Sequence, residues 1–160
     1  MVFLNILRDN REQKGWEFED HPAKVQDETI TTGDYTLAEF CEHDEENDTY
    51  YPNYAVERKA GQDFVSSVTR DRDRFLKEVK RASDWDSKLL VLIEEPKTLF
   101  KRQQGFMRFR DVSPSQLFGT VEKWERYYNV EFRFVGTRER GMRVTFDALS
   151  SRLRSLLTSE

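Results

Sequence analysis

The most chemically suggestive feature of this sequence is a group of three charged residues at the end of an apolar segment. In "YAVERKAGQDF", Glu57, Arg58 and Lys59 directly follow Val56. If the segment is a β-strand, residues two apart point to the same face with roughly 6–7 Å between their Cα atoms, so Glu57 and Lys59 place a carboxylate beside an ammonium group. An isolated pair of this kind is usually a surface ion pair of small energetic value, so further residues are needed to predict chemistry.

A second carboxylate lies upstream, in a threonine-rich segment with a turn signal. Asp34 follows Gly33 and precedes Glu57 by 57 − 34 = 23 positions. If the two segments pair as strands, Asp34 and Glu57 converge on one hard cation, and carboxylate oxygens bind Mg²⁺ or Mn²⁺ well. Such a metal lowers the pKa of a bound water, and a neighbouring lysine orients that water or stabilises charge on a phosphate. The combination predicts metal-assisted cleavage of a phosphodiester bond.

The elements that must position these residues begin with predicted strands, which show short apolar runs or alternate apolar with polar residues. They are "VFLNIL" at 2–7, "TITTGDYTL" at 29–37, "NYAVERK" at 53–59, "KLLVLIEE" at 88–95 and "VEFRFV" at 130–135. The second is expected to break or bend at Gly33, and the acidic stretch at 41–48 is typical of an exposed loop. The apolar run at 89–93 favours a central strand that is covered on both sides.

Three helices are predicted from apolar residues that recur at helical spacing. One runs over 63–82, and a second begins in "SPSQ" at 113–116, which has the signature of a capping box with proline in the first turn. The last helix carries its apolar residues on one side, a stripe that covers the sheet or faces a second copy of the chain. Its members are Phe146, Leu149, Leu153 and Leu156.

Length and composition are those of one soluble domain. The chain has 160 residues, of which 13% are aromatic and 35% charged, and its net charge of −4 argues against an overall basic coat but not against a local basic groove. Strands come first and then alternate with helices, which predicts an α/β domain with a mixed central sheet flanked by helices. The only cysteine, Cys41, excludes an intramolecular disulfide.

The same features bear on location. A single cysteine favours a reducing compartment, the first apolar run is too short for a signal peptide, and no segment approaches a membrane span. We therefore expect an intracellular protein of the cytoplasm, nucleoid or nucleus. Cys41 and His43 lie close together, but without a second matching pair they make a zinc site improbable.

Several stretches together resemble a known nuclease signature. "GDY" at 33–35 and "VERKAGQD" at 56–63 closely resemble the G-D…E-R-K-x-x-x-D pattern of the XPF-type structure-selective nucleases, a family that includes the archaeal Hef nuclease and belongs to the PD-(D/E)XK superfamily. "RDNRE" at 8–12 resembles the D-x-R-E stretch after the family's first strand. "RF" at 74–75 and "LLVLIEE" at 89–95 resemble the family's helix arginine and its next apolar strand. The resemblance covers about residues 2 to 95.

The resemblance implies a restriction-endonuclease-like domain over residues 1–160, completed by a helix, a strand and a helix at about 113–157. It implies a Mg²⁺- or Mn²⁺-dependent endodeoxyribonuclease that cuts branched DNA, such as flaps, forks or junctions, in repair or recombination. Asp34, Glu57 and Asp63 would bind or support the metal, Lys59 would be the catalytic lysine, and Arg58 would hold the site or the DNA backbone. Further matching positions would line the cleft (Asp9, Arg11 and Glu12) or contact DNA (Arg74).

Two features depart from the family pattern. The span between Asp34 and Glu57 is longer than usual, as expected if the acidic stretch at 41–48 is an insertion. No tandem helix-hairpin-helix module, which many relatives use to grip DNA and to dimerise, follows the nuclease pattern within these 160 residues. The substrate geometry, the number of metal ions and the oligomeric state are therefore left open, including a homodimer or a partner chain that supplies the DNA grip.

Structural alternatives exist for individual residues. Asp9 and Glu12 fit a capping box of a short helix, and Asp63 lies where a helix N-cap belongs. The predicted helix also carries a row of cations interleaved with acids, which is typical of a solvated face that pairs with itself. The row is Arg70, Arg74, Lys77 and Arg81, and of these only Arg74 is singled out by the resemblance.

A basic segment at 97–112 has two interpretations. It contains five cations and one acid, with three phenylalanines between them. It could hold phosphates and stack on unpaired bases, or it could be a connection whose phenylalanines dock on the core. The candidate DNA contacts in it are Lys101, Arg102, Arg108 and Arg110.

Two alternative functions stay open beside the structure-selective nuclease. One is a non-catalytic DNA-binding or scaffold partner of a heterodimeric nuclease, which the intact Glu57, Arg58, Lys59 and Asp63 argue against. The other is a restriction-like or single-strand nuclease of a mobile element, built on the same superfamily chemistry.

Overall fold

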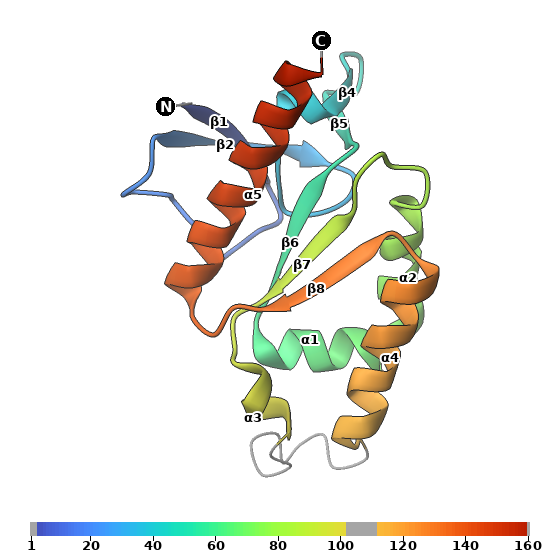
Figure 1. Cartoon of the computed structure of the whole chain (residues 1–160). Coiled ribbons are helices and arrows are strands. Elements are labelled where there is room, and N and C mark those ends of the chain that lie inside the picture. Colours follow the sequence, from blue (N-terminus) through green and yellow to red (C-terminus); the bar gives the residue numbers. More distant parts are fainter. Residues whose placement is uncertain (1–2, 102–111, 160) are drawn as a thin grey trace.

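The segments that carry the predicted site lie side by side in one mixed sheet (Figure 1). The computed structural model describes residues 3–101 and 112–159, in which eight strands follow the order β4-β5-β2-β1-β3-β6-β7-β8. The strands are β1 Leu4–Asp9, β2 Ala23–Ile30, β3 Tyr35–Leu37, β4 Cys41–Asp44, β5 Thr49–Pro52, β6 Ala55–Lys59, β7 Leu89–Ile93 and β8 Val130–Phe134. The predicted α/β class with a mixed sheet is confirmed.

Helices cover both faces of this sheet (Figure 1). They are the 3₁₀ helix η1 Ala38–Phe40 and the α-helices α1 Gly61–Val68, α2 Arg72–Arg81, α3 Lys97–Lys101, α4 Pro114–Tyr127 and α5 Arg138–Thr158. One core cluster joins α1, α2 and α4 to one face of β6–β8, and a second joins α5 and residues 16–18 to the opposite face. All five residues of β7 are buried, as its uninterrupted apolar run predicts.

Because side chains alternate along β6, its charged residues lie on different faces of the sheet. Ala55 belongs to the cluster under α1, α2 and α4, whereas Val56 belongs to the cluster under α5. Because successive strand side chains point to opposite faces, Glu57 and Lys59 face α1 and α2, and Arg58 faces the other side. The parallel pairing of β6 with β7 and of β7 with β8 places these residues in the well-packed half of the sheet.

The break predicted at Gly33 is confirmed, and two other predicted elements differ in detail. At Gly33 the chain turns, with φ of 87°, and β2 and β3 flank β1 on opposite sides. The helix predicted at 63–82 is broken at 69–71 into α1 and α2. The predicted loop at 41–48 was wrong, since Cys41–Asp44 forms β4 and pairs antiparallel with β5. Its polarity reflects an edge hairpin rather than an absence of structure.

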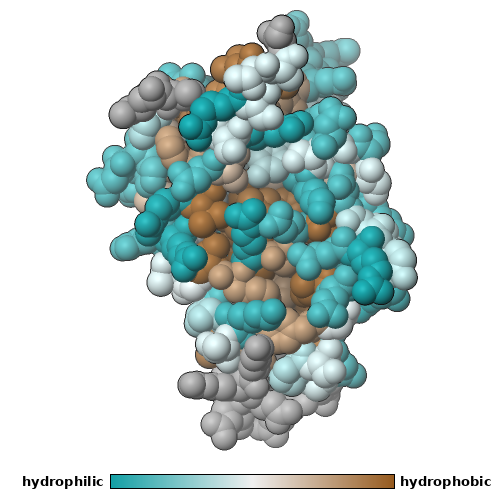
Figure 2. Space-filling view, in the orientation of Figure 1, coloured by the Kyte–Doolittle hydropathy of each residue, from teal (hydrophilic) through white to brown (hydrophobic). Residues whose placement is uncertain are grey.

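The remaining sequence signals are largely confirmed. Ser113 caps α4 with a complete capping box to Gln116. On α5, Leu149 and Leu153 are buried against the sheet, while Leu156 is 36% exposed, so the stripe mainly covers the sheet. Figure 2 shows apolar side chains over the β6–β8 region beside α5, surrounded by hydrophilic residues. In the part of the chain that is described, no helix is long and apolar enough to cross a membrane.

Candidate active site

Antiparallel pairing of β3 with β6 brings the two predicted carboxylates together. Tyr35 lies opposite Val56, and the same register extended by one residue sets Asp34 opposite Glu57. The Asp34 amide donates to the Val56 carbonyl at 2.8 Å, and the Arg58 amide donates to Asp34 Oδ2 at 2.8 Å. The convergence predicted for Asp34 and Glu57 is therefore seen, and backbone groups of β6 fix the position of the Asp34 carboxylate.

Glycine is required at the turn before Asp34. Gly33 has φ of 87°, a conformation that L side chains rarely adopt, and a Cβ atom there would lie 2.6 Å from Cβ of Ala55. The close approach of this turn to β6 thus depends on the missing side chain. It also explains why the Gly-Asp pair occurs as a unit in the sequence.

The Lys59 ammonium lies beside the Glu57 carboxylate, as the strand geometry predicts. Nζ of Lys59 is 3.3 Å from Oε2 of Glu57 and 4.6 Å from the centre of the Phe75 ring on α2. Only 17% of the Lys59 side chain is exposed. The ring and the carboxylate together hold the cation in the cleft between β6 and α2.

Burial and mutual repulsion of the acids shape the electrostatics of this group. Burial, followed by the charge of Glu12, raises the pKa of Asp34 to about 7. Burial and the charge of Asp34 also raise the pKa of Glu57 well above its usual range. Burial lowers the pKa of Lys59, but the charges of Glu57 and other nearby acids raise it more, so the lysine stays protonated. The pair of carboxylates therefore favours a bound proton or a bound cation.

The donor set fits a hard divalent cation. The buried Glu57 carboxylate and the partly buried Asp34 carboxylate line one cleft, and oxygen ligands are those that Mg²⁺ and Mn²⁺ prefer. Among residues 3–101 and 112–159, no three His, Cys, Asp or Glu side chains gather as a metal-binding group. Asp34 and Glu57 would hold the ion, and the other positions would be left to water, backbone or phosphate oxygens, which is common for Mg²⁺.

A cleft of about 550 Å³ opens over these side chains. Asp63 is exposed on the first turn of α1 and lines the cleft. The N-cap of α1 is Ala60, so the N-cap interpretation of Asp63 was wrong, and its support of the metal stays a prediction. Arg74 also lines the cleft, but its side chain is 83% exposed and its guanidinium pairs with Asp71 at 3.3 Å.

Glu78 is a further acid of the cleft, and in the sequence it is one of the acids interleaved with the cations of the predicted helix. Its Oε1 accepts the amide hydrogen of Gly33 at 3.4 Å, and its charge contributes to the raised pKa values of Asp34 and Glu57. The available signal was spacing, because Glu78 follows the buried Phe75 by three residues and so shares its helical face.

Arg58 lies on the opposite face of β6 from Glu57 and Lys59, in a largely buried ion network that includes Glu12, which also lines the cleft. Its guanidinium donates to Oε2 and Oε1 of Glu12 at 2.9 and 2.7 Å and also to Oε1 of Glu94. The side chains of Arg58, Glu12 and Glu94 are 11%, 7% and 10% exposed. Trp16 Nε1 donates to Oε2 of Glu94 at 3.3 Å. Of the two roles predicted for Arg58, this geometry fits the one that holds the site, and contact with DNA stays a prediction.

Asp9 and Arg11 form a separate pair at the rim. The buried Asp9 carboxylate accepts from Nε of Arg11 at 2.7 Å and from the Ile30 amide at 3.3 Å. The Arg11 side chain is 72% exposed and lines the cleft together with Asp9 and Glu12, as predicted. The capping-box alternative was wrong, because the Glu12 amide only closes a turn onto the Asp9 carbonyl and no helix follows.

The basic segment is only partly described. Phe100 is buried in the core, which agrees with docking of that residue on the domain. Arg102, Arg108 and Arg110 lie outside the described residues, as does the side chain of Lys101. Their contacts with DNA stay predictions.

Comparison with protein families and known structures adds a separate line of evidence on the family of this chain. The family model described as the ERCC4 domain matches residues 8–146. No curated protein matches the chain.

Two solved structures share the fold at low sequence identity. XPF from Aeropyrum pernix is 17% identical with a TM-score of 0.69, over 97% of this chain and 68% of that chain. XPF from Aeropyrum pernix in complex with DNA is 18% identical with a TM-score of 0.63, over 95% of this chain and 65% of that chain. The chain thus spans about two thirds of the length of the structures it matches.

Proposed function

The chain belongs to the ERCC4 domain family, and from this premise we propose that it is a metal-dependent endonuclease that hydrolyses phosphodiester bonds of DNA. The observation that carries the proposal is the convergence of Asp34, Glu57 and Lys59 on one wall of an open cleft. In this group a buried carboxylate, a partly buried carboxylate and a partly buried ammonium line the same cleft.

The residues have distinct roles in the proposed reaction. A bound Mg²⁺ or Mn²⁺ would supply a water of lowered pKa and offset charge on the phosphate. Asp34 and Glu57 hold the ion, and the Arg58 amide keeps the Asp34 carboxylate in place. The Lys59 ammonium orients the attacking water or stabilises the phosphate oxygens as the phosphorus–oxygen bond to the leaving strand breaks. Arg58 holds the site through its ion pairs with Glu12 and Glu94.

We extend the proposal to branched DNA as the substrate. The XPF-type signature at 33–35 and 56–63 supports flaps, forks or junctions, in repair or recombination, and one similar structure is a complex with DNA. A second copy or another chain would complete the grip on DNA. Among the residues proposed to bind DNA, Arg74 lines the cleft of the described part of the chain.

A substrate panel tests the proposal. Purified protein with Mn²⁺ or Mg²⁺ is incubated with flap, fork, four-way-junction, linear duplex and single-stranded DNA. We expect metal-dependent cuts in branched substrates that disappear on removal of the ion with a chelator. No cleavage by natively folded protein would favour a scaffold partner, and equal cleavage of all substrates would favour a restriction-like or single-strand nuclease.

A further inference from the structure

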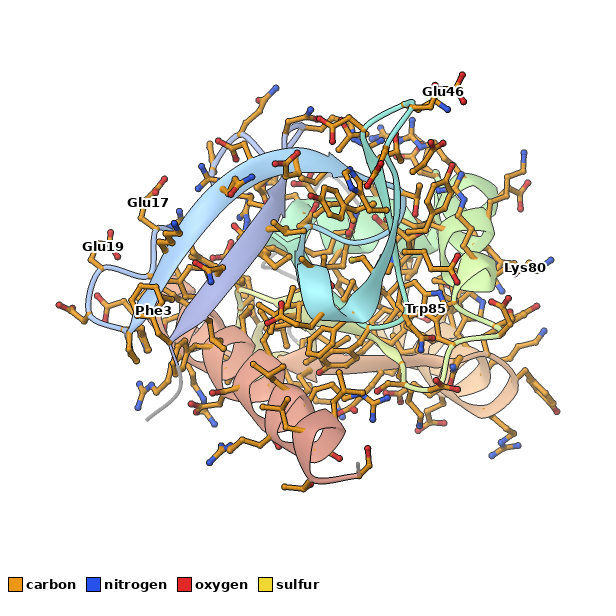
Figure 3. All side chains as sticks on the ribbon, turned by 90° about the horizontal axis from the view of Figure 1, so that it is seen from above. Phe3, Glu17, Glu19, Glu46, Lys80 and Trp85 are labelled. Atoms are coloured by element: carbon orange, nitrogen blue, oxygen red, sulfur yellow. The ribbon has the colours of Figure 1, made fainter. Side chains whose placement is uncertain are left out.

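A pocket of about 490 Å³ lies between α5 and the sheet, on the opposite face from the catalytic cleft. One wall is α5 between Val144 and Ser155, and the other is formed by Tyr54, Ser87 and Arg133. In Figure 3, α5 lies on the other side of the sheet from α2, on which Lys80 is labelled. Among the described residues the pocket and the catalytic cleft share no lining residue, so a ligand of the pocket would not contact the groups proposed for catalysis.

The two segments that form the sheet side of the pocket are held together by hydrogen bonds. The Asn53 side chain donates to the Asp86 carboxylate and accepts from the Asp86 amide, both at 2.9 Å. The side chain of Asn129 donates to the Ser87 carbonyl at 2.7 Å. Tyr54 and Ser87 directly follow Asn53 and Asp86 in the sequence, so this side of the pocket is fixed before any ligand binds.

Two guanidinium groups line the pocket from opposite walls. Nε of Arg133 donates to the Glu131 carboxylate at 2.5 Å, which leaves its terminal nitrogens as donors. Arg152 on α5 is partly buried and forms no ion pair with any described residue. Because a partly buried cation without a partner costs free energy, Arg152 favours a bound anion. Guanidinium groups bind phosphate oxygens through paired N–H donors.

The Tyr54 hydroxyl adds a donor near both cations. Its ring packs edge-on against Phe40, with 5.8 Å between the ring centres, which fixes the direction of the hydroxyl. Burial raises the pKa of Tyr54, and the charges of Arg133 and Arg152 oppose this rise, so both guanidinium groups are close enough to act on the hydroxyl. A hydroxyl and two guanidinium groups around one space are a donor set for a phosphate group.

Asp147 is an acid that also lines the pocket, and it limits which anions fit. It precedes Arg152 by five residues, which is about 7.5 Å along the axis of α5, so a phosphate at Arg152 can bind more than one helical turn away from it. Its carboxylate accepts hydrogen bonds from hydroxyl groups. The pocket volume of about 490 Å³ lies within the range of small-molecule sites, so it has room for an organic group besides the phosphate.

We propose that this pocket binds a small phosphate monoester whose organic part carries hydroxyl groups, the chemistry shared by nucleotides and sugar phosphates. The phosphate accepts from Arg133, Arg152 and the Tyr54 hydroxyl, and a hydroxyl of the organic part donates to Asp147. Neither a metal ion nor DNA takes part, so the proposal goes beyond the nuclease function and does not depend on it.

Titration calorimetry without metal or DNA tests the ligand class. Adenosine monophosphate and ribose 5-phosphate should bind, and adenosine and ribose at the same concentrations should not, because they lack the phosphate. Tighter binding of adenosine monophosphate would identify a nucleotide site, and equal binding of the two esters would identify a sugar phosphate site. Inorganic phosphate should bind more weakly than either ester. Binding of adenosine as tight as that of its monophosphate, or no binding of either ester, would overturn the proposal.

Substitutions test the location of the site. Arg152→Ala should weaken binding of the esters by at least about tenfold, because it removes a charge-assisted hydrogen bond. Arg154→Ala is the matched control and should bind like wild type, because Arg154 is an exposed arginine of the same helix that does not line the pocket. Tyr54→Phe keeps the ring against Phe40 and should weaken binding by about fivefold, and it tests the site if Arg152→Ala does not fold. Equal losses in Arg152→Ala and Arg154→Ala, or no loss in Tyr54→Phe, would overturn the assignment of the pocket.

Discussion

Adjacent residues of β6 belong to two charge clusters that are built in opposite ways. On the α1–α2 side, the Lys59 ammonium pairs with Glu57, and the nearby charges of Asp34 and Glu78 also raise its pKa. On the α5 side, Arg58 pairs with Glu12 and Glu94. Glu94 also accepts from Trp16 and lies 3.7 Å from Arg138. The first cluster has an excess of negative charge, and the second has donors for its acids.

Of three consecutive residues, Glu57 and Lys59 are therefore assigned to the proposed reaction, and Arg58 is assigned to the stability of the fold. Unmatched negative charge on largely buried acids costs folding free energy unless a cation binds there. The cleft over these acids is open to such a cation. A buried cluster whose charges are matched needs nothing from outside and ties residues 12–16, β6 and β7 together. Substitutions on the cleft face of β6 should therefore reduce cleavage, and substitutions on the opposite face should reduce the stability of the fold.

The largest expected effect is on catalysis, from the cleft face. Lys59→Ala and Asp34→Asn should each reduce the cleavage rate by at least about 100-fold, because each removes a group that acts on the ion, the water or the phosphate. The circular dichroism spectrum and cooperative unfolding should be retained. Full activity of either variant would contradict the assignment of the site.

The next largest effect is expected on the stability of the fold, from substitution of Arg58 on the α5 side of β6. Arg58→Ala leaves the buried Glu12 and Glu94 carboxylates without their main partner and should lower the free energy of unfolding by about 3–5 kcal/mol. Arg133→Ala, which breaks an exposed pair with Glu131, is the control and should cost about 0–1 kcal/mol. Urea unfolding measures both. Similar losses in the two variants would mean that the Arg58 network adds no special stability.

A smaller effect is expected on metal affinity, where two variants of Glu78 separate the contribution of its charge from that of its hydrogen bond with the Gly33 amide. Glu78→Gln keeps an acceptor for the Gly33 amide but removes a charge, and it should weaken Mn²⁺ binding by about fivefold, or roughly 1 kcal/mol. Glu78→Ala also loses the acceptor and should weaken binding further. Titration calorimetry with Mn²⁺ measures both variants, and wild-type affinity in Glu78→Gln would show that the charge of Glu78 does not reach the ion.

A last effect, which needs no metal or substrate, is the pH dependence of the stability of the metal-free protein. Because the pKa of Asp34 is raised from 3.8 to about 7, the folded state binds more protons than the unfolded state between these values. Stability from this group is therefore present at low pH and is lost as the pH rises through about 7. Asp34→Asn should flatten this part of the profile, measured as the thermal midpoint across the window. An unchanged slope would argue against the raised pKa.

Much of the site could be predicted because it depends on strand periodicity. Alternation in β6 places Glu57 with Lys59, and pairing of two predicted strands brings Asp34 to them. Glu78 was not assigned to the site because its position depends on how α2 docks after the break at 69–71. The resemblance singled out Arg74 instead. The β4 strand was missed because a polar edge hairpin has the composition of a loop.

If the cleft holds a metal ion as proposed, the glycine before Asp34 bears on which ions fit. The turn at Gly33 approaches β6 so closely that an added Cβ atom would lie 2.6 Å from Cβ of Ala55, so the missing side chain at Gly33 sets the gap between the strands that carry the two acids. Discrimination between ions of different radius depends on cavity size and rigidity, and Mg²⁺ demands a tighter arrangement than Ca²⁺. One added methyl group at position 33 would wedge the strands apart and shift the preference toward the larger ion, with every charged residue unchanged.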